Sequence, residues 1–226
     1  IDHSLLHPVL TDAEIEAGCR LALKYDVASV CVKPYAVKTA NNILKDSNVK
    51  VGCVVGFPHG NSTITVKVFE TRQAIADGAV EIDMVVNIGK VLQEDWEYVK
   101  NEINAVTEAS HNGKAIIKVI FENDYLPADK YKIELCKICT EAKVDFIKTS
   151  TGYGFVKQSD GSYNYKGATI PDLILMRKYA GPQVKIKAAG GIRTLDGLLA
   201  VKEAGAERCG ASATASIMEE AIKRFG

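Results

Sequence analysis

Short runs of hydrophobic, often β-branched residues alternate along the chain with longer amphipathic segments. Eight runs are expected to form strands: 1–5, 28–32, 49–55, 80–86, 115–121, 144–148, 183–187 and 207–211. The amphipathic segments expected to be helices include 12–24, 68–76, 95–109, 171–179 and 195–203, and a last helix is expected after residue 213. Local signals support these helices, because Thr11 precedes the first, Pro171 lies in a first turn and Gly113 follows a helix end.

Eight strand–helix units in 226 residues predict a closed parallel barrel, a (β/α)8 TIM barrel of the α/β class, rather than an open doubly wound sheet. At 47% hydrophobic residues the chain can bury the core of one large domain, so we expect a single domain over residues 1–226. Residues 158–167, rich in Gly, Ser and Asn, are interpreted as a loop insertion within one unit. Because the chain begins at Ile1 and not at Met, we expect a few residues to precede it.

Charge and cysteine usage narrow the possible partners and the compartment. The 28 basic and 28 acidic residues balance without a run of like charge, so neither nucleic acid nor a membrane is an expected partner. No apolar stretch approaches the roughly 20 residues of a membrane-spanning helix. Six scattered cysteines without a secretory leader favour free thiols and a cytoplasmic location. Cys136 and Cys139 form a C-x-x-C pair, but the helical periodicity around them favours packing on a helix face over a redox or zinc role.

Polar residues occupy one side of nearly every predicted strand. Because side chains two residues apart share a face of a strand, Asp83 lies opposite Ile82 and Met84, and the other strands repeat this pattern. If the wholly apolar side faces the helices, one set of residues converges inside the barrel: Asp2, Cys31, Asp83, Lys118, Lys148 and Lys187. Any one charge could instead reach solvent at a strand end, but the joint pattern favours function because enclosed charges are costly unless paired.

Two of these strands end in a lysine that is followed by a glycine-bearing loop. Lys148 precedes Thr-Ser-Thr-Gly, and Lys187 precedes Ala-Ala-Gly-Gly. A second cation a few ångströms away and low-dielectric walls disfavour the charged form of an amine and can lower one pKa toward about 7. An unprotonated lysine attacks carbonyls, so the pair predicts amine chemistry on a carbonyl substrate. Lys185 shares the parity of Lys187 and is expected to point to the barrel floor.

The loops after the last two strands carry the signals of a phosphate site. Glycines there let backbone N–H groups approach an anion closely, and the second loop leads into the positive end of a helix. The expected phosphate-binding residues are Gly152, Gly190, Gly191, Arg193, Gly210 and Ser212. A single such loop is weak support because tight turns also need glycine, but two in consecutive units are stronger.

At these positions the chain resembles the deoxyribose-phosphate aldolases, a family of class I, Schiff-base-forming aldolases on a (β/α)8 barrel. The resemblance spans almost the whole chain and runs in order through 2–6, 29–32, 56–60, 81–85, 117–120, 148–152, 189–193 and 210–212. Its most specific part is the pairing of Lys-Thr-Ser-Thr-Gly at 148–152 with the later lysine and Gly-Gly-x-Arg at 187–193.

The resemblance implies a role for several residues and a reaction. Lys148 is expected to form the imine, Lys187 to be the neighbouring cation and Asp83 to join a proton relay with water. The remaining pocket residues are expected to be Cys31, Asp2, Lys118 and Thr151. The implied reaction is reversible cleavage of 2-deoxy-D-ribose 5-phosphate to acetaldehyde and D-glyceraldehyde 3-phosphate in deoxynucleoside breakdown. No cofactor or metal is expected, since the four histidines lack ligand spacing.

Several features leave alternatives open. The segment from Tyr153 to Lys166 is longer than in many relatives, so it could act as a lid or alter which aldehyde is accepted. Two other interpretations compete with the aldolase: a barrel isomerase, epimerase or aldolase on a different sugar phosphate, and a non-catalytic barrel that binds phosphosugars. Barrels of this kind often form dimers, so a homodimer is also possible.

Overall fold

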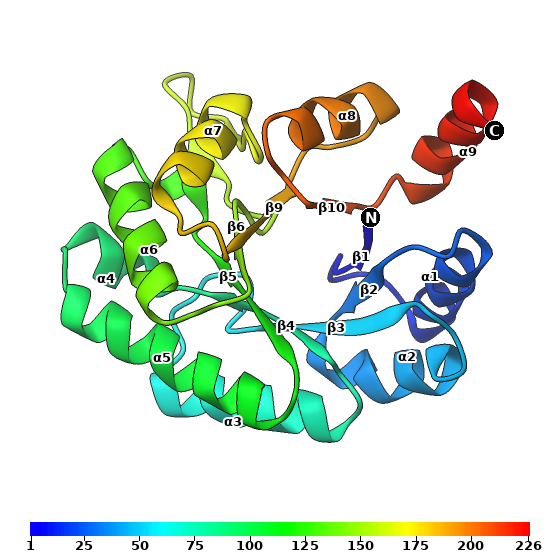
Figure 1. The fold of residues 1–226 in the computed structure, drawn as a ribbon, viewed down its shortest axis with the longest axis horizontal. Coiled ribbons are helices and arrows are strands. Elements are labelled where there is room, and N and C mark those ends of the chain that lie inside the picture. Colours follow the sequence, from blue (N-terminus) through cyan, green and yellow to red (C-terminus); the bar gives the residue numbers. More distant parts are fainter.

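The computed structural model describes residues 1–226 and contains a closed barrel of eight parallel strands (Figure 1). The barrel strands are β1 (Asp2–Leu5), β2 (Ser29–Val32), β3 (Lys50–Val55), β4 (Glu81–Val85), β5 (Ile116–Ile120), β6 (Phe146–Lys148), β9 (Lys185–Ala189) and β10 (Arg208–Ala211). Each strand pairs with the next one along the chain except that β6 pairs with β9, and β10 closes the ring on β1. The predicted eight-stranded barrel is confirmed, with every strand inside its expected segment or extending it by at most two residues.

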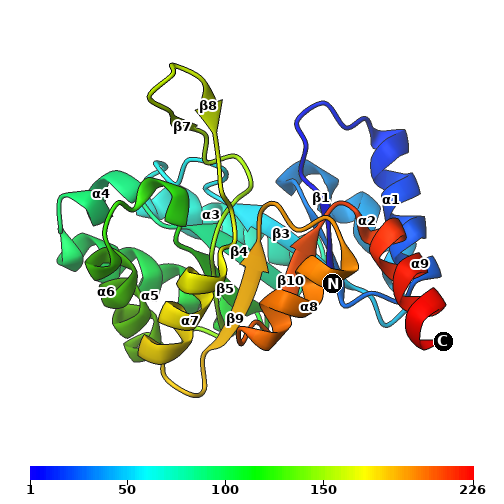
Figure 2. The same cartoon turned by 90° about the horizontal axis from the view of Figure 1, so that it is seen from above.

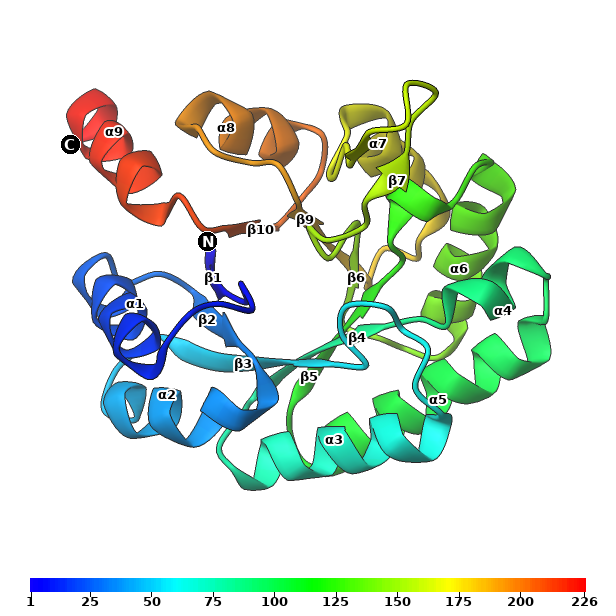
Figure 3. The ribbon, with the colours of Figure 1, turned by 180° about the vertical axis from the view of Figure 1, so that it is seen from behind.

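Helices surround the barrel on its outer side, as the view from behind also shows (Figure 3). They are α1 (Asp12–Lys24), α2 (Val37–Leu44), α3 (Ile64–Ala76), α4 (Ile88–Leu92), α5 (Trp96–Asn112), α6 (Asp129–Glu141), α7 (Ile170–Tyr179), α8 (Leu195–Glu203) and α9 (Thr214–Phe225), with short 3-10 turns η1 (Pro34–Ala36) and η2 (Asn123–Tyr125). The start of α1 follows from a capping box, in which the Thr11 hydroxyl accepts from the Glu14 amide and the Glu14 carboxylate accepts from the Thr11 amide. Cys136 and Cys139 are both buried on α6, as their helical periodicity predicted.

The hydrophobic core lies between the barrel and its helices. Forty-eight buried residues form one apolar cluster there, and it includes Ile82 and Met84 of β4 and Ile117 and Val119 of β5. The residues between them on the same strands carry the opposite parity and face inward, where Lys118 is fully buried. The outer faces of the strands therefore supply the apolar burial, which leaves the inner face available for charged groups.

The insertion after β6 is a β-hairpin, which corrects the expectation of a plain loop. Its strands are β7 (Val156–Lys157) and β8 (Tyr163–Asn164), paired antiparallel. Asp160 closes the turn by accepting hydrogen bonds from the amide and hydroxyl of Ser162. Figure 2 shows the hairpin standing out from the end of the barrel toward which the β9 arrow points, the carboxyl end of the strands. No helix of the structure is both long and apolar enough to cross a membrane.

A buried ion pair that the sequence pattern did not indicate fixes the loops beside β4. The Lys67 ammonium of α3 donates to the carbonyls of Gly60 and Val85 and pairs with Glu102 of α5 at 2.7 Å. The other oxygen of Glu102 accepts from the amide of Asn87 at 2.8 Å. Both side chains are fully inaccessible to solvent, so this network holds the end of β4 and the loop after β3 to the two helices behind them.

Candidate active site

Three lysines from three neighbouring strands meet at one carboxylate in the barrel interior. Asp83 of β4 accepts from Lys118 of β5 through Oδ1 at 2.7 Å. Its other oxygen, Oδ2, accepts from Lys148 of β6 at 2.8 Å and from Lys187 of β9 at 2.7 Å. The strand register produces this meeting, because Asp83 is paired with Lys118 across β4 and β5, and Lys148 with Lys187 across β6 and β9.

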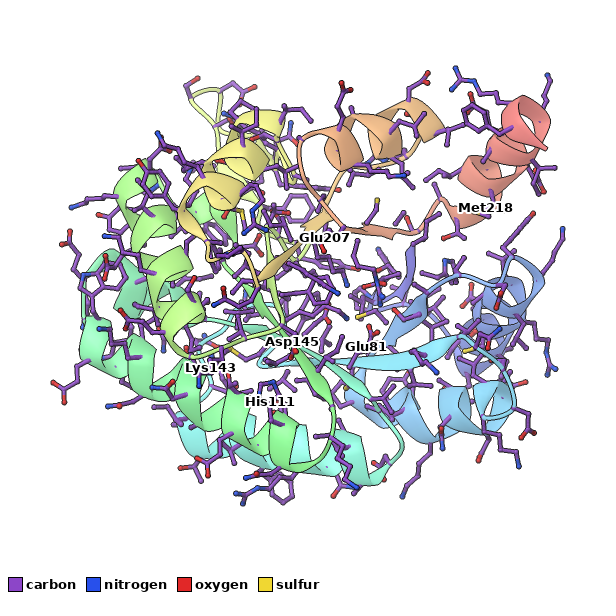
Figure 4. The ribbon with its side chains drawn as sticks, in the orientation of Figure 1. Glu81, His111, Lys143, Asp145, Glu207 and Met218 are labelled. Carbon is purple, nitrogen blue, oxygen red and sulfur yellow. The ribbon has the colours of Figure 1, made fainter.

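A second layer of charges lies beneath this carboxylate. Asp2 of β1 forms ion pairs with Lys187 at 2.6 Å and with Arg208 of β10 at 2.6 Å. Arg208 also donates to both oxygens of Glu81, which accepts in turn from Lys118 at 2.6 Å. Glu81 is labelled among the side chains that fill the interior in Figure 4. Arg208 and Glu81 were not among the predicted site residues, although Glu81 shares the inward parity of Asp83.

The balance of charge in this cluster singles out one lysine. The three carboxylates of Asp2, Glu81 and Asp83 face four cations: Lys118, Lys148, Lys187 and Arg208. Lys148 contacts only Asp83, whereas Lys118 and Lys187 each contact at least two carboxylates. The charges of Lys118, Lys187 and Arg208 balance the three carboxylates, so the cluster is neutral when Lys148 carries no charge. Of the four cations, Lys148 is therefore the one whose charge is least needed to balance the carboxylates.

Burial and neighbouring charge shift the pKa values of the two key lysines in opposite directions. Burial lowers the pKa of Lys148, and the ammonium of Lys187 lowers it further while Asp83 opposes both. Burial would also lower the pKa of Lys187, but the carboxylates of Asp2 and Asp83 outweigh it and raise that pKa well above its ordinary value. The expected effect of the second cation is therefore present but smaller than that of burial, and Asp2 decides which lysine stays charged.

Asp83 itself is held in its ionised form. Burial alone would raise the pKa of its carboxyl group, but Lys118, Lys148 and Lys187 together keep that pKa well below its ordinary value. A fixed carboxylate at this point accepts hydrogen bonds and stabilises positive charge on the nitrogens around it.

An apolar wall stands next to the lysines. Leu6, Cys31 and Val54 form a small buried cluster, separate from the main core, against which Phe57 and Tyr153 pack. The rings of Phe57 and Tyr153 meet edge to face at 5.6 Å. Burial raises the pKa of the Cys31 thiol to about 11, and its sulfur lies 3.9 Å from Asp83 Oδ2. Cys31 is thus a neutral thiol beside the lysines, and the wall suits a small apolar group.

The loop after Lys148 is held by bonds to two neighbouring segments. The hydroxyl of Thr149 donates to the carbonyl of Ala189 at 2.9 Å and accepts from its amide at 3.0 Å, which ties the loop to the end of β9. Thr151 donates through its amide and its hydroxyl to Glu122, a buried residue just after β5 that no motif had indicated. Lys148 and Thr151 therefore lie at the two ends of a short segment whose position is set from both sides.

Five of the six predicted phosphate residues lie at the same end of the barrel in three loops, whereas Gly210, which was expected in a loop, lies within strand β10 and pairs with Asp2 and Ala189. Gly152, Gly190 and Gly191 all have positive φ, at 87°, 91° and 80°, so these turns require glycine. Nothing lies within 4 Å of the place where a side chain of Gly152 would begin, whereas Gly190 packs against Gly167. Arg193 and Ser212 are exposed near the starts of α8 and α9.

Gly210, predicted to bind phosphate, also lies against the side chain of Lys187. A side chain at Gly210 would meet Cε of Lys187 at 3.4 Å, so the absence of a side chain at this position leaves room for the lysine.

No group of three His, Cys, Asp or Glu side chains lies close enough to hold a metal ion. Two hollows of about 540 and 450 Å³ lie elsewhere, between α7 and α8 and beneath the hairpin, and none of the three interior lysines lines either.

The sequence relationships fit this geometry. The model of the DeoC/LacD family of aldolases matches residues 1–218. The chain belongs to this aldolase family. It is 52% identical to the deoxyribose-phosphate aldolase of Rhodopirellula baltica over all of this chain and 89% of the relative. It is 47% identical to that of Caldicellulosiruptor saccharolyticus over 97% of this chain and 96% of the relative.

Solved structures agree on the fold of this DeoC/LacD family aldolase. An aldolase named QR15 is 38% identical and superimposes with a TM-score of 0.89 over 99% of this chain and 95% of its own. The tetrameric deoxyribose phosphate aldolase of Aeropyrum pernix is 26% identical, with a TM-score of 0.86 over 100% and 90%. The N-acetylmannosamine-6-phosphate 2-epimerase of Clostridium perfringens, at 13% identity and a TM-score of 0.66 over 98% and 90%, shares the fold alone.

Proposed function

We propose that this aldolase reversibly cleaves 2-deoxy-D-ribose 5-phosphate to acetaldehyde and D-glyceraldehyde 3-phosphate through an imine on Lys148. One observation carries the assignment of the nucleophile: Lys148 is the interior lysine whose charge the carboxylates require least, and burial lowers its pKa. Relatives at 45–52% identity named deoxyribose-phosphate aldolase support the substrate. The reaction belongs to the breakdown of deoxynucleosides.

The chemistry begins with attack of the unprotonated Lys148 Nζ on the aldehyde carbon of the open-chain sugar. A neutral carbinolamine forms, takes up one proton from the relay described below and loses water to give a protonated imine. Removal of the proton from the hydroxyl at C3 lets the C2–C3 bond break, and its electron pair moves into the imine to give an enamine. Glyceraldehyde 3-phosphate leaves; the enamine then takes a proton at C2, and water releases acetaldehyde and free Lys148.

The neighbours of Lys148 have complementary parts in these steps. The nitrogen gains positive charge in the imine, and the fixed carboxylate of Asp83 at 2.8 Å stabilises that charge. Lys187 is protonated in the resting site, so its ammonium is the proposed proton donor; it is linked to Lys148 through one oxygen of Asp83 and regains its proton later in the cycle. Together with a water molecule these groups form the proposed proton relay, and positioned proton transfer contributes about 100-fold or more in rate. Asp2 and Lys118 hold Lys187 and Asp83 in place.

The two ends of the substrate have distinct surroundings in this proposal. The apolar wall of Leu6, Cys31 and Val54 suits the two-carbon fragment that leaves as acetaldehyde. The phosphate is assigned to the loop amides of Gly152, Gly190 and Gly191 and to the exposed Arg193, with Ser212 at the adjacent loop. A phosphosugar barrel without catalysis would need these loops but not three buried lysines, whose burial is costly.

Borohydride trapping tests the proposal directly. The protein is incubated with acetaldehyde, reduced with borohydride and digested, and mass spectrometry locates the ethyl adduct. We expect the adduct on Lys148 and its loss in Lys148→Ala, together with all turnover of 2-deoxyribose 5-phosphate. Lys185→Ala, which removes an exposed lysine from the same barrel, is the matched control and should react normally. An adduct on another lysine, or turnover by Lys148→Ala, would exclude the assignment.

Two wider expectations stay predictions. A homodimer is proposed for the assembly, and light scattering at micromolar concentration measures it. A cytoplasmic location is proposed on the strength of six unpaired cysteines, all of which are buried as free thiols.

A further inference from the structure

A buried glutamate joins the end of β5 to the loop that follows Lys148. Glu122 is 1% exposed and adopts left-handed backbone angles of φ 57° and ψ 63°, an uncommon conformation for a residue with a side chain. This conformation turns the chain from β5 into η2. The left-handed backbone conformation of Glu122 is energetically unfavourable, and it places the carboxyl group within reach of the loop that follows Lys148.

The carboxyl group of Glu122 is bonded to consecutive parts of that loop. Its oxygens accept from the Thr151 amide at 3.2 and 3.3 Å, and one also accepts from the Thr151 hydroxyl. The same hydroxyl accepts from the amide of Tyr153 at 2.9 Å. A side chain at Gly154 would begin 2.8 Å from the carboxyl carbon and Oε1 of Glu122, so the loop folds tightly over this group.

The next acidic residue on the same turn holds the other end of the insertion. Asp124 accepts from the Lys166 amide at 2.6 Å and from the Gly167 amide at 3.0 Å. The segment between Thr151 and Gly167 is therefore held at both ends by hydrogen bonds to two carboxyl groups of the same turn. Gly152, with its open surroundings and positive φ, lies immediately after the Glu122 contact.

We infer that Glu122 is a positioning residue, which acts through Thr151 to hold the amide of Gly152 toward the substrate phosphate and so sets the affinity for phosphorylated substrate. This inference rests on the proposed function for the location of the phosphate. It assigns no contact between Glu122 and substrate, because Glu122 is covered by the loop that it holds. The expected signature is a change in KM for the phosphorylated sugar with little change in kcat.

The inference carries a pH dependence. Burial raises the pKa of the Glu122 carboxyl to about 7, and Asp124 adds to the rise, while the Thr151 bonds and Lys148 oppose it. Of the neighbouring titratable groups, Asp124 acts on this carboxyl, and Lys148 acts on it when it is protonated; Tyr125 is the adjacent titratable group. Above pH 7 both oxygens accept from Thr151. Below it one oxygen carries a proton and competes as a donor, so the loop is held less firmly as the pH falls.

Glu122→Gln tests this pH dependence because the amide resembles the protonated acid at every pH. Steady-state kinetics are measured from pH 5.5 to 8.5 with 2-deoxyribose 5-phosphate and with 2-deoxyribose. At pH 8.5 we expect a KM about tenfold above wild type for the phosphorylated sugar, as expected for losing a charge-assisted hydrogen bond. At pH 5.5 the two proteins should have similar KM values. The ratio of variant to wild type cancels the titration of the substrate phosphate itself, whose second pKa is about 6.

Controls separate this effect from a general loss of charge or of stability. Glu141→Gln removes an exposed carboxylate from the end of α6 and should leave KM unchanged at every pH. Gly154→Ala perturbs the same contact from the loop side, since its methyl group displaces the Glu122 carboxyl, and should raise KM for the phosphorylated sugar at pH 8.5. Gly89→Ala, where a methyl group has room, is its matched control. If Glu122→Gln does not fold, the KM of Gly154→Ala for the phosphorylated sugar at pH 8.5 tests the inference instead.

Distinct results would overturn the inference. A variant-to-wild-type KM ratio that does not change with pH, an equal loss for the unphosphorylated sugar, or a fall in kcat alone would each exclude the positioning role. An unchanged KM in Gly154→Ala would exclude it independently. Trapping of acetaldehyde by Lys148 is measured in the same proteins. If wild type forms no adduct, the proposed function has failed, whereas a normal adduct with an unchanged KM rejects only the role of Glu122.

Discussion

Substitution of Lys187 by leucine tests how the barrel interior makes Lys148 reactive. Lys187→Leu removes the neighbouring ammonium and leaves an apolar side chain in a fully buried position. The Nζ atoms of Lys148 and Lys187 lie 2.8 and 2.7 Å from the same Asp83 oxygen, so they are at most 5.5 Å apart. At an effective dielectric constant of about 20 this separation corresponds to a repulsion of about 3 kcal/mol.

The sign of the effect follows from the charges that remain. Lys187 lowers the pKa of Lys148, and Asp83 raises it. Without Lys187 the attraction of Asp83 is less opposed, so the pKa of Lys148 rises and the protonated, unreactive form persists to higher pH. A free-energy change of about 3 kcal/mol corresponds to roughly a hundredfold smaller fraction of unprotonated Lys148 at a given pH below that pKa.

The assay is the initial rate of borohydride-trapped adduct on Lys148 as a function of pH, with acetaldehyde as the only substrate. We expect the rate of Lys187→Leu at pH 7 to fall roughly a hundredfold and to recover as the pH is raised. Lys185→Leu is the matched control, because Lys185 lies two residues earlier on β9 but is exposed, with its ammonium 5.6 Å from the Phe146 ring. Circular dichroism checks that both variants fold. Identical pH profiles for Lys187→Leu and Lys185→Leu would refute the electrostatic role of Lys187.

Three further predictions concern the phosphate site, the scaffold and the thiols. Arg193→Ala should raise KM for 2-deoxyribose 5-phosphate about tenfold and leave 2-deoxyribose unaffected; an equal loss for both sugars would contradict the anion site. Lys67→Met leaves the buried Glu102 carboxylate without its cation and should lower the free energy of unfolding by about 3–5 kcal/mol in urea titrations, and Lys67→Met combined with Glu102→Leu should recover part of it. All six thiols are buried, so a thiol reagent should modify them slowly in the native protein and rapidly in urea; fast native modification of Cys31 would contradict its burial and raised pKa.

Much of the barrel could be predicted because its signals are local. A strand alternates its two faces every two residues, so the apolar residues at 82 and 84 and the acid at 83 reveal an outer and an inner side without knowledge of the fold. The same alternation placed Lys118, Lys148 and Lys187 on the inside, where the structure brings them to one carboxylate. The hairpin at 156–164 was missed because two-residue strands of polar composition carry no such alternation.

The local pattern of residues was enough to predict the eight barrel strands, the inward side of most of them and the presence of lysines that share an enclosure. Which of these lysines has the fewest carboxylate partners could not be predicted in this way, because it depends on contacts between distant strands. Asp2 lies near the start of the chain on β1 and Lys187 lies far along it on β9, and closure of the barrel through β10, which pairs with both strands, brings their charged groups to 2.6 Å. Glu122 reaches Thr151, and Lys67 reaches Glu102, in the same way across distant parts of the chain. Periodicity is a property of neighbouring residues, whereas electrostatic energy depends on distances in space, and these exist only once the barrel has closed.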